Sequence, residues 1–349
     1  MMATAAVLAG LFAIGGPMTG LQDQPLLITV ASNVRLRTEA SVEVPILSML
    51  PIATDLTRTG GSADGRWLHV RTPDGTEGWV STALTWTVPT GHRQRLVERL
   101  IQVRLNRQGD GFETRAELLE LIERTAAGHH DREGVARFVL YRLQALDGVL
   151  RSIPFSHRSR SARVSQLLQA RAAVIVYNEP GGRWMLRRDA ILEAHEPHRG
   201  TREGQQIAWM AATNGLPGEC EGDLACYVRW TDLLEGEYLR LYPQGSFVLS
   251  GLGRIHERIP IWLSLIQTPD SRFFDPATTC LHLRQPLGTL RSAIEGATGR
   301  EPGASPDLES TQRERILLAL DEIGARCGGP AGSEDPALHT PSPPPHPKP

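Results

Sequence analysis

The dipeptide Asp74-Gly75 constrains the fold of this chain more than any other feature of its sequence. It lies between two runs of β-forming residues, Trp67-Leu68-His69-Val70 and Gly78-Trp79-Val80. Asp-Gly accepts the positive backbone angles of a tight turn, so these runs are predicted to form a β-hairpin. Further short runs of alternating character, separated by turn residues, lie between Val30 and Leu84. The whole segment predicts a small antiparallel β-barrel, with the two tryptophans opposite each other on neighbouring strands or close to it.

The motifs of this segment resemble those of the bacterial SH3 domain, from about residue 25 to residue 88. The matching positions are Asn33, Val34 and Arg35, then Val44, Ile46 and Leu50, then Gly65, Trp67 and Val70, then Asp74, Gly75, Gly78, Trp79 and Val80, and finally Leu84. The chain departs from the family pattern at Leu50-Pro51-Ile52, where a glycine and a basic residue are expected. The resemblance implies a binding or targeting module of cell-wall or cell-envelope proteins rather than a catalyst.

The candidate ligand-binding residues are Trp67, Arg58 and Asp64. Aromatic faces beside polar loops are what peptide-binding barrels of this kind offer. Trp79, which follows Gly78, is interpreted as mainly a core residue.

Beyond the break at Val88-Pro89-Thr90-Gly91 the apolar spacing changes from two residues to three and four, which is typical of helices. The 349 residues suffice for two domains with their own cores. The sequence therefore predicts a multidomain β plus α fold, a small SH3-like β-barrel followed by a mainly α-helical domain from Gly91 to Cys327.

Local signals place several helices and one further hairpin in the second domain. Thr114 with Glu117 predicts a capping box, and Asp131 predicts the N-cap of a helix that Gly148 ends. Extended segments on both sides of Pro180-Gly181-Gly182 predict a turn between two strands. Further helices are predicted near residues 96–101, 164–171, 187–195, 203–213, 287–297 and 308–325.

The two ends of the chain differ from the domains. Residues 1–21 contain a short apolar run that is typical of a signal peptide, with a buried first strand or an uncleaved anchor as alternatives. Residues 328–349 are rich in Pro, Gly and Ser, which predicts disorder. We therefore expect an exported protein, periplasmic or extracellular, without a stable membrane span in the mature chain.

The four cysteines of an exported chain favour pairing over metal binding. A short Gly-containing loop separates Cys220 from Cys226, which leaves Cys280 and Cys327 as the second pair. Neither pair has the spacing of a zinc knuckle or of a redox C-x-x-C motif. The sequence predicts two structural disulfides.

No pattern in the sequence points firmly to catalysis, a cofactor or a metal. His195-Glu196-Pro197-His198 is the nearest approach to a metal cluster, but Pro197 disfavours the continuous helix of an H-E-x-x-H site, so a surface role is expected there and at His129-His130. The carboxylates Glu219, Glu221 and Asp223 cluster near the Cys220–Cys226 loop and could serve a glycosidase.

Two hypotheses for the function follow. The first is a non-catalytic cell-envelope protein whose barrel binds a peptide, a protein or a cell-wall ligand. The second is a cell-wall hydrolase in which the barrel delivers an unrecognised helical catalytic domain. The formal net charge of −2 gives no reason to expect nucleic acid as a partner.

The pairing of the cysteines is testable by mass mapping of non-reduced protein taken from the exported fraction. The expected cross-linked peptides join Cys220 to Cys226 and Cys280 to Cys327. Four free thiols in that fraction would contradict both the pairing and the compartment.

Overall fold

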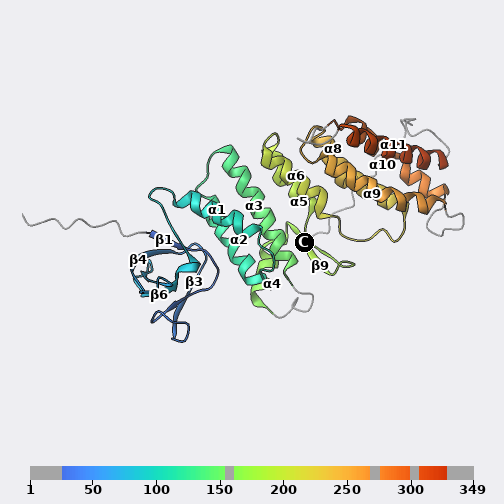
Figure 1. The fold of residues 1–349 in the computed structure, drawn as a ribbon. Helices are drawn as coiled ribbons and strands as arrows, with labels where there is room; N and C mark the ends of the chain where they lie inside the picture. Colours follow the sequence, from blue (N-terminus) through green and yellow to red (C-terminus); the bar gives the residue numbers. More distant parts are fainter. Residues whose placement is uncertain (1–25, 154–160, 268–275, 299–305, 328–349) are drawn as a thin grey trace, which may run out of the picture. The chain divides into compact units, whose positions relative to one another are not determined.

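The computed structural model describes residues 26–153, 161–267, 276–298 and 306–327 (Figure 1). The predicted signal segment and the predicted disordered tail lie outside these residues. The chain divides into two compact units, residues 1–100 and residues 101–349, which we call the sheet unit and the helical unit. The division falls within the first helix, α1 (Arg93–Leu105). The chain is thus mixed β plus α, with an antiparallel sheet followed by helices.

The sheet unit contains an antiparallel sheet of seven described strands, in the order β3-β2-β6-β5-β4-β1-β7. Strands β3 and β7 are its edges among the described residues. The strands are β1 (Leu26–Thr29), β2 (Val34–Arg37), β3 (Ile46–Leu50), β4 (Asp55–Gly61), β5 (Trp67–Arg71), β6 (Glu77–Ser81) and β7 (Thr85–Thr87).

The predicted Asp74-Gly75 hairpin is confirmed, because β5 pairs with β6 across that turn. Gly75 has a φ of 88°, which is the left-handed conformation that favours glycine. Asp74 accepts hydrogen bonds from the Thr72 hydroxyl and from the Thr76 backbone amide, the latter at 3.2 Å. These bonds hold the turn that sets the register of the two strands.

One face of the sheet carries the core of this unit. Its buried side chains alternate along the strands, as expected for a half-buried sheet. They are Leu27, Val34, Leu36, Leu50, Leu56, Leu68, Val70 and Val80.

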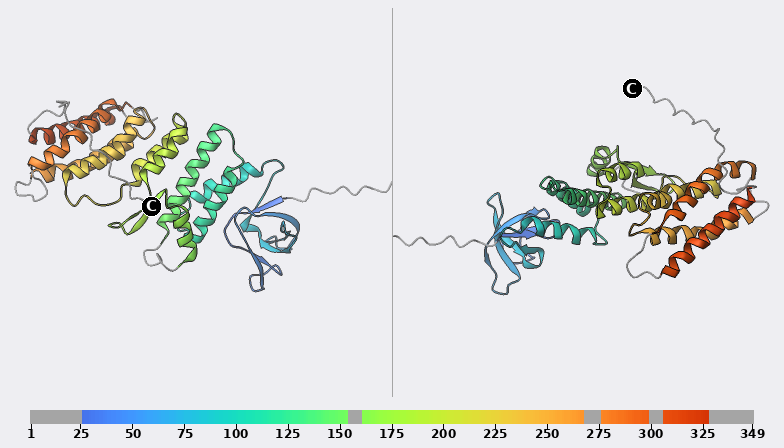
Figure 2. Two further views of the ribbon diagram at one scale, coloured as in Figure 1. Left: turned by 180° about the vertical axis from the view of Figure 1, so that it is seen from behind. Right: turned by 90° about the horizontal axis from the view of Figure 1, so that it is seen from above.

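The helical unit is built from helices and one small hairpin. The helices are α2 (Phe112–Ala126), α3 (Arg132–Arg151), α4 (Ala162–Ala170), α5 (Arg188–His195), α6 (Arg202–Asn214), α7 (Leu224–Thr231), α8 (Glu237–Leu241), α9 (Val248–Gln267), α10 (Pro276–Gly296) and α11 (Pro306–Arg326). Helix α2 packs on α3, and α11 packs on both α9 and α10, as Figures 1 and 2 show. Strands β8 (Ile175–Asn178) and β9 (Arg183–Leu186) form the hairpin predicted around Pro180-Gly181-Gly182.

Two predictions of helix ends are wrong and one is confirmed. Asp131 does cap α3, since its side chain accepts a hydrogen bond from the Gly134 amide at 2.7 Å. Helix α2 begins at Phe112, before the predicted capping box at Thr114 and Glu117, because Gly111 in an extended conformation is its N-cap.

Gly148 lies inside α3, which continues to Arg151. A Cβ atom on Gly148 would lie 2.6 Å from a guanidinium nitrogen of Arg115. The glycine therefore makes room for a side chain from α2 instead of ending the helix.

Both predicted disulfides are present. The Cα atoms of Cys220 and Cys226 are 5.4 Å apart, and those of Cys280 and Cys327 are 5.3 Å apart. The second bond connects α10 with the residue that follows α11. In the chain-entropy model it stabilises the folded state by about 4 kcal/mol, because it closes the longer loop.

No helix among the described residues is long and apolar enough to cross a membrane.

A buried ionic cluster joins α9 to the π-helix η4 (Asp232–Gly236). The Glu235 side chain is fully buried. It accepts hydrogen bonds from Arg254 at 2.7 Å and from Arg258 at 2.6 and 2.8 Å. Arg258 also donates to the Thr231 hydroxyl at 2.7 Å. A buried carboxylate requires such partners, so the packing of η4 against α9 depends on both arginines.

Substituting Arg258 by Met should lower the free energy of unfolding by about 3 kcal/mol, because it leaves the buried Glu235 carboxylate with one cationic partner. Urea denaturation monitored by circular dichroism measures this change. Arg315→Met, at an exposed position on α11, serves as the control. Equal stability of the two variants would contradict the role assigned to the cluster.

Candidate functional site

The three predicted ligand-binding residues lie on the hairpin of β4 and β5 and on its loop. The side chain of Asp64 makes its hydrogen bonds within this loop. Its oxygens accept hydrogen bonds from the Ser62 hydroxyl at 2.6 Å, from the Arg66 side chain at 2.6 Å and from the Arg66 amide at 3.1 Å. The Ser62 hydroxyl and then the Arg66 guanidinium hold the pKa of Asp64 well below its usual range. Asp64 therefore shapes the loop that precedes Trp67.

Arg58 lies along its own strand. Its side chain donates to the Gly60 carbonyl at 3.3 Å and is exposed. A Cβ atom on Gly61 would lie 3.4 Å from the Arg58 guanidinium and 3.5 Å from the Trp67 carbonyl. The structure thus brings Arg58 beside the backbone of Trp67, with the two glycines leaving space between the strands.

The two tryptophans share one face of the sheet but are not directly opposite each other. Trp67 pairs with Ser81, and Trp79 pairs with His69, which makes the tryptophans diagonal neighbours. The interpretation of Trp79 as mainly a core residue is wrong. Trp79 is only half-buried, because Val80 and Gly78 take the core-facing positions of β6.

Three half-buried rings form what we call the aromatic row, Trp67, His69 and Trp79. The rings of His69 and Trp79 meet edge to face, with centroids 5.0 Å apart at 66°. A nitrogen of His69 also lies 2.6 Å from the hydroxyl of Thr59 on β4. Edge-to-face packing and this hydrogen bond fix the orientation of the row on the sheet.

Large apolar side chains are exposed at the neighbouring edge of the sheet. Ile46, Leu47 and Met49 lie on the edge strand β3, each with 45–47% of its surface exposed. Val42, in the preceding loop, is 65% exposed. The run of apolar residues around Ile46 was visible in the sequence, but its exposure depends on the place of β3 at the sheet edge.

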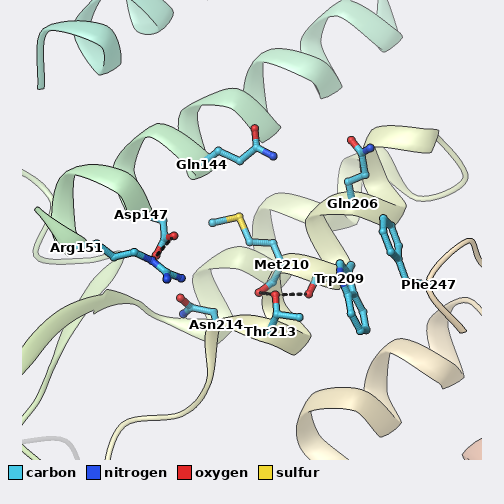
Figure 3. Close-up of a pocket in the computed structure, with 9 residues that line it drawn as sticks. All are labelled: Gln144, Asp147, Arg151, Gln206, Trp209, Met210, Thr213, Asn214 and Phe247. Atoms are coloured by element: carbon cyan, nitrogen blue, oxygen red, sulfur yellow. Dashed lines mark hydrogen bonds and ion pairs between the residues drawn. The ribbon is translucent and has the colours of Figure 1, made fainter. Parts of the chain in front are cut away.

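The helical unit holds a pocket of about 330 Å³ between α3 and α6. Figure 3 shows Gln144 of α3 and Met210 of α6 pointing toward this space. Trp209 and Phe247 border one end, and their rings are parallel within 1° with centroids 5.3 Å apart. Arg151 lies at the other end. The predictions from sequence missed this pocket.

A larger cavity of about 760 Å³ in the same unit is bordered by Asp223 and Asp232. Asp223 is exposed and caps α7 by accepting a hydrogen bond from the Ala225 amide at 2.9 Å. Asp232 accepts from Arg240 at 2.5 Å and from Thr289 at 2.9 Å. Both carboxylates therefore have structural partners.

The acidic cluster of Glu219, Glu221 and Asp223 is exposed throughout. A muramidase-like acid needs a carboxyl group held protonated in an apolar cleft. The surroundings of these three side chains do not offer that environment.

The expected surface role of His195 and His198 is wrong, because both side chains are buried. Pro197 does interrupt the helix, and the short turn η3 (Glu196–His198) follows α5. His195 contacts the Tyr242 hydroxyl at 2.6 Å. His129, by contrast, is half-buried against the ring of Phe138.

Within the described part of the chain, no group of three or more His, Cys, Asp or Glu residues could hold a metal ion. No family model, curated protein or solved structure matches this chain.

The two buried histidines make stability depend on pH. Burial lowers the pKa of His195 and of His198 below the ordinary value of 6.5. Above that pH both imidazoles are neutral in the folded and the unfolded chain. Below it the unfolded chain binds protons that the folded chain does not, so stability falls as the pH falls toward the lowered pKa values.

The melting temperature should therefore decrease as the pH is lowered from about 6.5 to about 5. The decrease should be smaller in the double variant His195→Gln, His198→Gln, whereas His92→Gln, at an exposed position, should retain it. Differential scanning calorimetry across this range measures the effect. An unchanged slope in the double variant would show that these histidines do not cause it.

Proposed function

We propose that the sheet unit is a binding module of the bacterial SH3 type, curved into a small barrel, and that it holds a peptide, protein or cell-wall ligand against the aromatic row. The protein acts in this proposal as a non-catalytic component of the cell envelope, exported to the periplasm or the exterior. The observation that carries the proposal is the half-buried row of Trp67, His69 and Trp79 on one face of the sheet.

The chemistry of this face suits an extended ligand. Aromatic rings supply a large contact area at a small cost in conformational entropy, and their polar edges accept or donate hydrogen bonds. Arg58, which is exposed on β4 near the backbone of Trp67, adds a cation to the same hairpin. On the same sheet, Ile46 and Met49 expose further apolar surface on the edge strand β3, beyond Arg35 and Arg37 of β2.

The two disulfides support an oxidising compartment. Disulfides form and persist in exported proteins and are rare in the reducing cytosol of mesophiles. Both cysteine pairs of the helical unit form disulfide bonds. Together with the apolar N-terminal run they support export.

Retention on purified peptidoglycan tests the proposal. Trp67→Ala and Trp79→Ala should each reduce retention about tenfold, because truncating a central aromatic anchor costs about 1 to 2 kcal/mol of binding free energy or more. Trp86→Ala is the matched control, since Trp86 is also half-buried in the sheet unit but lies on β7, outside the row.

Since Trp79 is only half-buried, its substitution should cost about 1 to 2 kcal/mol of stability and leave the protein folded. Circular dichroism of each variant checks this. Folded variants at both row positions that are retained like the parent would remove the aromatic row from the mechanism. Turnover of the peptidoglycan by the parent would favour the hydrolase alternative.

A further inference from the structure

We propose that the pocket between α3 and α6 binds a neutral pyranose sugar. This inference concerns the helical unit alone and does not depend on the function proposed for the sheet unit. It rests on the combination of a flat aromatic wall, uncommitted amides and a charge-neutral rim within one cavity of about 330 Å³, a volume suited to a small ligand.

The aromatic wall consists of Trp209 and Phe247. Their rings are stacked, parallel within 1° with centroids 5.3 Å apart, and together they give the pocket an apolar aromatic border (Figure 3). Trp209 is held from behind, because it meets Tyr238 edge to face at 5.2 Å and its ring lies against Gly251 of α9. A sugar ring has a flat face of C–H groups, which packs on such a surface.

The polar lining suits the hydroxyl groups at the edge of the same ring. The side-chain amides of Gln144 and Gln206 border the pocket and make no hydrogen bond with another part of the described chain. Each amide offers both a donor and an acceptor, which matches a hydroxyl group that needs both. The two amides come from different helices, so they can contact different hydroxyl groups of one ring.

The ion pair and the polar lining of the pocket disfavour two other classes of ligand. Arg151 is paired with Asp147 at 2.8 Å, so the cation is already neutralised and an anion such as phosphate gains little. The polar lining disfavours a purely apolar ligand, which would leave the amides without partners. A neutral ligand with one apolar face and a polar edge fits both constraints.

The frame of the pocket is already ordered. The Asn214 amide donates to the Leu186 carbonyl at 2.6 Å, and the Thr213 hydroxyl donates to the Trp209 carbonyl at 3.0 Å. The first bond ties the end of α6 to β9, and the second lies within α6, the helix that carries Trp209. Preorganised walls of this kind lower the entropic cost of binding.

The test is isothermal titration calorimetry of the full chain with glucose, N-acetylglucosamine and the N-acetylglucosamine dimer, with glycine as a zwitterionic comparison. We expect saturable one-to-one binding of at least one sugar and none of glycine. Gln206→Ala and Phe247→Leu should each weaken that binding at least fivefold. Gln169→Ala, at an exposed position on α4 outside the pocket, should leave it unchanged.

A second measurement does not depend on the folding of the variants. In the unsubstituted protein, titration with the bound sugar should shift the NMR resonance of the Trp209 indole and leave that of the fully buried Trp262 in place. The proposal is overturned if none of the three sugars binds, if glycine binds in their stead, or if the Trp209 resonance does not move at saturation.

Discussion

The close approach of β6 to β2 at Gly78 is the constraint on which the sheet unit depends. A Cβ atom at this position would lie 2.7 Å from the Arg37 carbonyl and 2.9 Å from the Leu36 side chain, so no larger residue fits without a shift of the strands. Gly78 therefore occupies the core-facing position before Trp79. Because side chains alternate along a strand, Trp79 lies on the opposite face, where it meets His69. The aromatic row exists because this glycine keeps the core face of β6 flat.

The helical unit is organised around a separate core and a different kind of constraint. Its largest fully buried side chain is Trp262 of α9. The same helix supplies Arg254 and Arg258 to the buried Glu235 on η4. Helix η4 is a π-helix, and it carries this carboxylate in the interior. The disulfide between Cys280 and Cys327 adds a covalent connection between α10 and the end of α11, and α11 packs on α9.

Local chemistry accounts for the features that the sequence could predict. Asp74-Gly75 and Pro180-Gly181-Gly182 predict hairpins because the geometry of a turn depends on a few adjacent residues. The cap of α3 at Asp131 and the apolar spacing of several helices are local in the same way. The disulfides could be predicted because four cysteines and one short loop leave few sensible pairings.

Features set by contacts between distant residues could not be predicted. In the run Gly78-Trp79-Val80, either Trp79 or its two neighbours could face the core. The contact of Gly78 with β2 decides between the two. Helix α9 was not expected, because Pro260 interrupts its pattern, yet buried Ile259 and Trp262 maintain the packing on both sides of the proline. The pocket between α3 and α6 combines residues from distant segments, such as Gln144 and Phe247, so no spacing in the sequence reveals it.

The side-chain resonances of tryptophan offer the most direct test of the claim that the aromatic row is a binding surface. The indole N–H signals of the seven tryptophans can be assigned by single Trp→Phe substitutions and followed by NMR while soluble peptidoglycan fragments are added. The account predicts that the signals of Trp67 and Trp79 shift in a saturable manner and that the signal of buried Trp262 does not move. Saturable binding of the fragments without any change at Trp67 and Trp79 would contradict it.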